Sequence, residues 1–208
     1  MQEADRMTAK EYRARQDNRK NPYKQIQGKQ NRYAGACFEE IINAACIYYD
    51  QQNIAYIEKT PEPMAPIRRM EQNRFVAVFT EKAQCDYKGT YSGGQAIAFE
   101  AKHTSKDRIM QAAVTPRQWG CLDRQEAMGA WCFVLVSIKT QDFFRVPWGV
   151  WKNMKRYFGR KYLTADDMEP FRVPQEGSTV LFLNLYGETT VTLTEIEEAN
   201  SGADRKYT

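Results

Sequence analysis

The stretch from Cys85 to Lys102, CDYKGTYSGGQAIAFEAK, decides the fold. Two runs of strand-forming residues flank Ser92-Gly93-Gly94, and glycines supply the backbone freedom of a tight turn, so the stretch predicts a β-hairpin. Residues two apart lie on the same face of a strand, so Glu100 and Lys102 project side by side. The preceding strand runs antiparallel to theirs and brings Asp86 toward them.

These three side chains are the minimal parts for hydrolysing a phosphodiester. Two converging carboxylates form the hard oxygen site that holds Mg²⁺ together with several waters. A lysine beside that ion stabilises a developing phosphorane or helps to deprotonate the attacking water. Acid-acid-lysine patterns also arise by chance as surface ion pairs, since 27% of the residues are charged. Here, however, Glu100 and Lys102 are the only charges in an otherwise apolar run over 96–102, where unpaired charge is costly.

The elements around this hairpin predict an α/β fold with a central mixed sheet flanked by helices. Apolar residues recur at helical spacing after Tyr33, and a continuous apolar run begins at Trp131, as in a buried strand. The other expected elements are a helix over 33–51, a strand over 54–57, a helix over 118–128, paired strands over 131–137 and 142–146, a helix over 150–157 and a late hairpin over 180–193.

Residues 66–84 differ in composition from their surroundings. Arginines and a lysine alternate there with apolar residues such as Phe75. The pattern fits either a protruding hairpin or a helix, and periodicity does not decide between them.

Length and composition predict one globular domain in the cytoplasm. The chain has 208 residues, of which 42% are hydrophobic, with no apolar run long enough to span a membrane and no apolar signal core near the first residue. Five widely spaced cysteines without a CxxC pair argue against a disulfide framework or a zinc site. The single histidine, His103, argues against zinc hydrolases that need several.

The charge is unevenly distributed. Residues 1–32 hold nine Lys/Arg and four Asp/Glu, so this segment carries +5 and the remainder −1 of the total +4. We expect a flexible basic arm over 1–30, a single nuclease domain over 31–198 and a frayed tail over 199–208. A basic arm suits a polyanion such as DNA, although a solvated tail has the same composition. A second basic cluster that either lines DNA or forms a plain solvated face contains Lys152, Lys155, Arg156, Arg160 and Lys161.

Several short motifs in register resemble one known family. They are Gly28-Lys-Gln-Asn-Arg32, Gly35, Phe38-Glu-Glu-Ile-Ile42, Lys59-Thr-Pro-Glu-Pro63, Asp86-Tyr-Lys-Gly89, Tyr91, Phe99-Glu-Ala-Lys102 and Thr104. In order and spacing they resemble the RecU family of Holliday-junction resolvases, over roughly residues 28–137. The resemblance implies a restriction-endonuclease-like core that acts as a homodimer on branched DNA, uses Mg²⁺ with Mn²⁺ as a substitute, and carries a stalk over 66–84.

The resemblance also implies roles for individual residues. Asp86 and Glu100 would ligate the metal, Lys102 would stabilise the transition state, and Gln118 would be a further metal-site residue. In related nucleases a glutamate on the first helix faces the metal, which makes Glu40, or its neighbour Glu39, a candidate auxiliary carboxylate.

The chain departs from the family pattern at several places near the site. Gln84 stands where the family commonly has threonine two positions before the first Asp, so that role is not carried over. Pro116-Arg117 stands where the family has Asp-His before the glutamine, which weakens the assignment of Gln118. Phe99 stands where the family often has an acid, so any role of that acid is absent.

Guanidinium groups bind phosphates, and aromatic surface accommodates unstacked bases. The resemblance implies that the stalk enters the open centre of a four-way junction, and its arginines and Phe75 suit that role; the alternative is an ordinary hairpin packed on the body. The expected DNA-contacting residues are Arg68, Arg69, Arg74 and Phe75 in the stalk, together with Lys29 and Arg32.

The function expected from the sequence is a junction-resolving endonuclease whose two subunits make paired nicks. Three alternatives remain open: a nuclease with the same core that cuts linear or forked DNA, a non-catalytic DNA-binding recombination protein, and a structural partner protein that assembles through a hydrophobic face.

Overall fold

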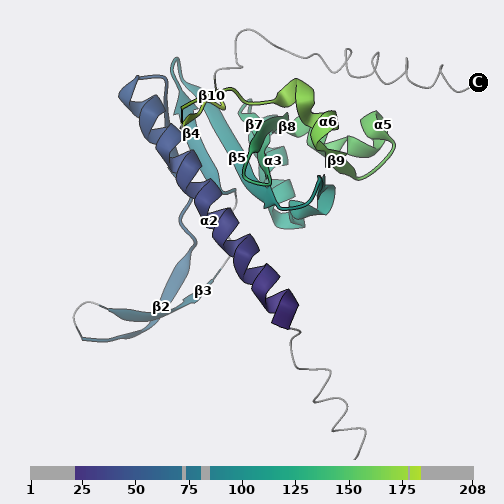
Figure 1. Ribbon diagram of the computed structural model, residues 1–208. Coiled ribbons are helices and arrows are strands. Elements are labelled where there is room, and N and C mark those ends of the chain that lie inside the picture. The colour runs from purple at the N-terminus through teal and green to yellow at the C-terminus, as the bar shows by residue number, and fades with distance from the viewer. Residues whose placement is uncertain (1–21, 72–73, 81–84, 178, 184–208) are drawn as a thin grey trace, which may run out of the picture.

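The computed structural model describes residues 22–71, 74–80, 85–177 and 179–183, with side chains from residue 28 onward. In this part of the chain a five-stranded sheet of order β1-β4-β5-β7-β8 forms the centre of the molecule (Figure 1). Its strands are β1 (Ala55–Lys59), β4 (Tyr87–Tyr91), β5 (Gln95–Thr104), β7 (Trp131–Ile138) and β8 (Asp142–Pro147). The sheet is mixed, because β5 and β7 are parallel and the other neighbours are antiparallel.

Helices cover both faces of this sheet. The long helix α2 (Pro22–Gln51) packs one face with Phe38, Ile42 and Tyr49. On the other face α3 (Pro116–Ala127) and α4 (Trp148–Lys152) contribute Leu122 and Trp148 to a second buried cluster. The predicted fold class, an α/β core with a central mixed sheet flanked by helices, is confirmed.

The remaining elements are short. They are β2 (Met64–Arg69), β3 (Phe75–Phe79), β6 (Arg108–Met110), η1 (Gln111–Ala113), α5 (Met154–Phe158), β9 (Tyr162–Thr164), α6 (Ala165–Met168), η2 (Glu169–Phe171), β10 (Gln175–Glu176) and β11 (Thr179–Val180). The expected late hairpin is corrected in part, because β11 pairs with β10. Residues 184–193 of that hairpin, and the expected tail over 199–208, lie outside the described residues.

The start of α2 corrects a boundary expected from the sequence. The helix begins at Pro22 rather than near Tyr33, so residues 22–30 are not part of a flexible arm. Proline is well tolerated at the first helical position, where its missing N–H has no partner to lose, and the Lys and Gln residues that follow favour helix. Residues 1–21, the rest of the expected arm, lie outside the described residues.

A stack of three aromatic rings fixes the register of the central strands. Tyr87, Phe99 and Phe133 are directly paired across β4, β5 and β7. Their ring centroids lie 4.9 Å and 4.7 Å apart, and neighbouring planes are tilted by 4° and 10°. All three point to the α2 face, so Glu100 and Lys102, one position out of phase, point to the α3 face.

The segment whose conformation the sequence left open is a hairpin. β2 and β3 pair antiparallel with a register shift between Pro66 and Arg68, and the hairpin extends away from the body in Figure 1. Its strands are exposed over nearly their whole length. Among the described residues no helix is long and apolar enough to cross a membrane.

Close packing of β1 against β4 requires glycine at position 89. A Cβ there would overlap the carbonyl oxygen of Tyr56 and lie 2.7 Å from Cα of Ile57. We expect Gly89→Ala to lower the free energy of unfolding by about 2 kcal/mol, because backbone atoms cannot move aside cheaply. Urea unfolding measures this. The control is Gly35→Ala in α2, where a Cβ meets nothing within 4 Å; it should be neutral or stabilising by up to about 1 kcal/mol. An equal loss in both variants would contradict the argument.

Candidate functional site

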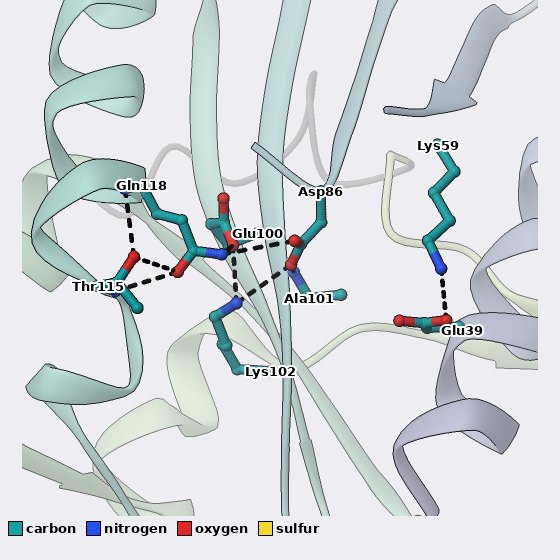
Figure 2. A network of polar contacts seen from close by, with 8 residues as sticks. All are labelled: Glu39, Lys59, Asp86, Glu100, Ala101, Lys102, Thr115 and Gln118. Carbon is teal, nitrogen blue, oxygen red and sulfur yellow. Dashed lines mark hydrogen bonds and ion pairs between the residues drawn. The ribbon is translucent and has the colours of Figure 1, made fainter. Parts of the chain in front are cut away.

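Asp86, Glu100 and Lys102 meet at one point on the α3 face of the sheet (Figure 2). Nζ of Lys102 lies 3.1 Å from Oδ2 of Asp86 and 2.7 Å from Oε2 of Glu100. Asp86 directly precedes β4, and its Oδ2 also accepts a hydrogen bond of 3.0 Å from the backbone N–H of Ala101. Strand pairing has thus brought together two carboxylates that are 14 positions apart in the sequence. Both of them bond the same ammonium group.

Burial makes this an electrostatically unusual cluster. The side chain of Glu100 has no exposed surface, and burial raises its pKa to about 8. Burial also acts to lower the pKa of Lys102, but the charges of Asp86 and Glu100 outweigh it and raise that pKa. Lys102 therefore stays positively charged, and the cluster keeps a cation next to a carboxyl group that water cannot reach.

The donor set fits a divalent metal ion. Oε1 of Glu100 is buried and has no hydrogen-bond partner, so an acceptor in the cluster is left unsatisfied. No group of three or more His, Cys, Asp or Glu side chains suited to a metal occurs in the described part of the chain. Two carboxylates with the remaining positions left to water match Mg²⁺, which dehydrates reluctantly.

Gln118, on the first turn of α3, completes the cluster. Its Nε2 donates hydrogen bonds to Oε2 of Glu100 and, at 3.5 Å, to Oδ1 of Asp86. Its Oε1 accepts from the backbone N–H and from the hydroxyl of Thr115, which forms a capping box at the start of the helix. Gln118 thus reaches the predicted site, with its amide nitrogen rather than its oxygen facing the carboxylates.

The model of the family described as "RecU: Recombination protein U" matches residues 33–184. The chain belongs to the RecU family. Curated relatives named "Holliday junction resolvase RecU" from Streptococcus pneumoniae strains Hungary19A-6 and CGSP14 are 34% identical over 114 residues, which is 52% of this chain and 57% of each relative. The chain therefore matches little more than half the length of these relatives. A solved structure of Archaeoglobus fulgidus Hjc, a Holliday junction resolvase, covers 64% of this chain and 91% of its own at 10% identity and a TM-score of 0.40.

The first-helix glutamates of this RecU chain do not contact the cluster. Glu39 pairs instead with Lys59 of β1 at 2.6 Å, and Figure 2 shows this pair apart from the carboxylates. Glu40 is exposed, and no contact in the described residues links it to Asp86 or Glu100. Its auxiliary role stays a prediction.

The expected DNA-contacting residues lie on two separate surfaces of the RecU chain. Those of the stalk are exposed on β2, on β3 or between them, where the guanidinium carbon of Arg69 lies 5.9 Å from the ring centroid of Phe75. Lys29 and Arg32 are exposed on α2. Their roles in DNA binding stay predictions.

Sequence reasoning missed Thr115. The signal was present, since Thr115-Pro-Arg-Gln118 has the Ser/Thr-x-x-Glu/Gln spacing of a capping box. The motif orients the amide of Gln118, so Thr115 acts on the site through its neighbour.

Removing the cation from this cluster should destabilise the metal-free protein. Lys102→Met leaves two carboxyl groups facing each other in a poorly solvated place, and we expect a loss of about 2 kcal/mol in the free energy of unfolding, measured in urea with EDTA. The control is Lys139→Met, whose ion pair with Asp107 is exposed and should matter little. A Lys102→Met protein as stable as the wild type would refute the inferred interdependence of the three charges.

Proposed function

We propose that this chain is a divalent-metal-dependent DNA endonuclease that resolves four-way junctions. The observation that carries the proposal is the convergence of Asp86, Glu100 and Lys102 around an unsatisfied, buried carboxylate oxygen. Membership in the RecU family, and the name shared by its relatives, supports DNA junctions as the substrate.

In the proposed reaction Asp86 and Glu100 hold the metal, and Lys102 stabilises the charge that develops on the scissile phosphate. The ion, Mg²⁺ with Mn²⁺ as a substitute, supplies polarisation of the phosphate and activation of a water when it is bound. The backbone N–H of Ala101 holds the Asp86 carboxylate in place. Strand pairing and the cap at Thr115 hold these groups together before the substrate binds, and such preorganisation favours stabilisation of the transition state.

Gln118 has a positioning role in this proposal. Its amide donates to both carboxylates and is held by the cap at Thr115. As a ligand through its oxygen, it would have to turn its amide and lose the bonds of the capping box. The contacts therefore favour Gln118 as a group that orients the metal-binding carboxylates.

The β2–β3 hairpin is the proposed junction-recognition element. Ile67, Phe75 and Phe79 are 64%, 54% and 66% exposed on a two-stranded ribbon. Exposed apolar area on this scale marks a contact surface, and the arginines beside it supply positive charge. Unstacked bases and phosphates at the crossover match both features.

A homodimer that nicks two strands symmetrically completes the proposal. A four-way junction has two-fold symmetry, and a two-fold dimer presents one site to each of two equivalent strands. The cytoplasm is the proposed compartment.

Asp86→Asn should abolish nicking while leaving junction binding intact. The amide cannot neutralise a divalent cation, so we expect the cleavage rate of a synthetic four-way junction in Mg²⁺ to fall by at least about 100-fold. The matched control, Asp107→Asn, changes an exposed carboxylate soon after β5 and should cleave normally.

A second readout does not depend on cleavage. Mg²⁺ at 100 times its Kd stabilises the folded state by roughly 2.7 kcal/mol. It should therefore raise the melting temperature of the wild type and of Asp107→Asn, but not that of Asp86→Asn. Normal nicking by Asp86→Asn would overturn the site. Absence of nicking by the wild type in Mg²⁺ or Mn²⁺, with junction binding preserved, would favour the non-catalytic recombination protein.

Shortening the hairpin should remove the preference for branched DNA. Pro66 and Ala77 are directly paired, so replacing residues 67–76 by Asn-Gly closes the ribbon with a two-residue turn. We expect junction affinity to fall toward that for linear duplex, with duplex affinity unchanged. Competition binding with junction, fork and linear DNA measures this. Unchanged selectivity would exclude the hairpin as the recognition element, and equal cleavage of linear DNA by the wild type would favour the linear-duplex nuclease.

A further inference from the structure

We propose that a trough around Trp119 binds one nucleotide of the DNA strand that enters the active site, with the base stacked on the indole and its phosphates on Lys155 and Lys161. The proposal rests on the nuclease function proposed above and adds a path for the strand.

Two adjacent hollows make up this trough. One of about 500 Å³ has mainly apolar walls, including Met110, Val114 and Pro116. The other, of about 610 Å³, has a strongly basic lining. Gln111, Trp119 and Lys161 line both hollows, so the two are adjacent. Their size is within the roughly 300–1,000 Å³ of small-ligand sites.

The indole of Trp119 is held in place rather than free on the surface. Its ring contacts Trp148 edge to face, with centroids 4.8 Å apart and planes at 73°. Trp148 is itself fixed by a 2.7 Å hydrogen bond from its Nε1 to Asp123. Trp119 remains partly exposed where it lines the trough. A rigid, half-exposed aromatic face is what a nucleobase stacks on.

Hydrogen bonds hold the floor between the two hollows in place. Nε2 of Gln111 donates hydrogen bonds of 2.9 and 3.2 Å to the backbone carbonyls of Trp151 and Lys152. The backbone N–H of Gln111 bonds the carbonyl of Lys161 at 3.0 Å. These bonds join η1 to the end of α4 and to the start of β9, so the walls of the trough are fixed relative to one another.

The positive charge of the residues that line the second hollow favours binding of an anion. Four cations and no carboxylate line it. Lys152 is already paired with Glu126, with Asp123 at 3.8 Å. Lys155 and Lys161 are exposed and have no ion pair within the described part of the chain. Two uncompensated ammonium groups beside an apolar, aromatic hollow match the phosphate and the base of a nucleotide.

The position of the trough connects it to the reaction. Gln118, which bonds both catalytic carboxylates (Figure 2), directly precedes Trp119 on the first turn of α3. Consecutive Cα atoms are about 3.8 Å apart, and the side chains diverge by roughly 100° around the helix. Gln118 and Trp119 therefore join the carboxylate cluster and the trough through a single helical turn.

The test measures strand binding without catalysis. Fluorescence anisotropy of a labelled ten-residue oligothymidylate is recorded with the full chain in EDTA. For the double variant Lys155→Ala/Lys161→Ala we expect roughly 10-fold weaker binding, and a slope of log K against log salt smaller by about 0.7 for each phosphate that the variant no longer neutralises. The matched control, Lys106→Ala/Arg124→Ala, removes two exposed cations outside the trough and should keep the slope of the wild type.

A second pair of variants tests the stacking platform. Trp119→Ala should weaken binding by about 5- to 100-fold, whereas Trp119→Phe keeps an aromatic face and should keep most of the affinity. Melting temperatures check that each variant folds. If Trp119→Ala does not fold, the two exposed lysines, which make no packing contacts of comparable extent, still decide the question.

The outcomes separate the two proposals. Wild-type nicking of junctions in Mg²⁺, together with unchanged oligothymidylate binding by the lysine variant, would overturn the trough and leave the nuclease standing. Trough-dependent binding by a wild type that never nicks would overturn the nuclease and leave the trough as a strand-binding site.

Discussion

The stacking of Tyr87, Phe99 and Phe133 across three strands is the contact on which the site depends. Side chains alternate between the faces of a sheet, so a slip of one residue in this register would turn Glu100 and Lys102 toward α2 and carry the rings out of their core. The favourable free energy of burying and stacking the rings therefore holds the charged residues on the opposite face, although burial of those charges is itself unfavourable.

Burying Glu100 sets a conflict between stability and function. A carboxylate without exposed surface is costly unless it is paired, and here Lys102 and Gln118 satisfy one oxygen while the other has no partner. The unsatisfied oxygen is a cost in the isolated chain that a bound cation would offset. Local structure at odds with packing rules is typical of functional sites, where strain is retained for chemistry.

Much of this arrangement follows from local sequence. The glycine turn, the two-residue period and the apolar context of Glu100 and Lys102 predicted the hairpin and the shared face, and the apolar run from Trp131 predicted a buried strand. Three features did not follow. Helix α2 starts at Pro22 within a polar segment that has no apolar stripe. The segment over 66–84 has no periodicity that distinguishes a hairpin from a helix. The direction of the Gln118 amide depends on contacts with Asp86, 32 residues earlier in the sequence.

Helix α3 lies in the crossover between the parallel strands β5 and β7. Parallel neighbours cannot be joined by a tight turn, so a long crossover that contains α3 connects them. Gln118 consequently reaches the carboxylates only when contacts between distant parts of the sequence have closed, which is the slow part of folding for such topologies. An unfolded or nascent chain thus has no preformed cavity for a cation, so the ion binds the folded chain alone and its binding free energy adds to the free energy of unfolding.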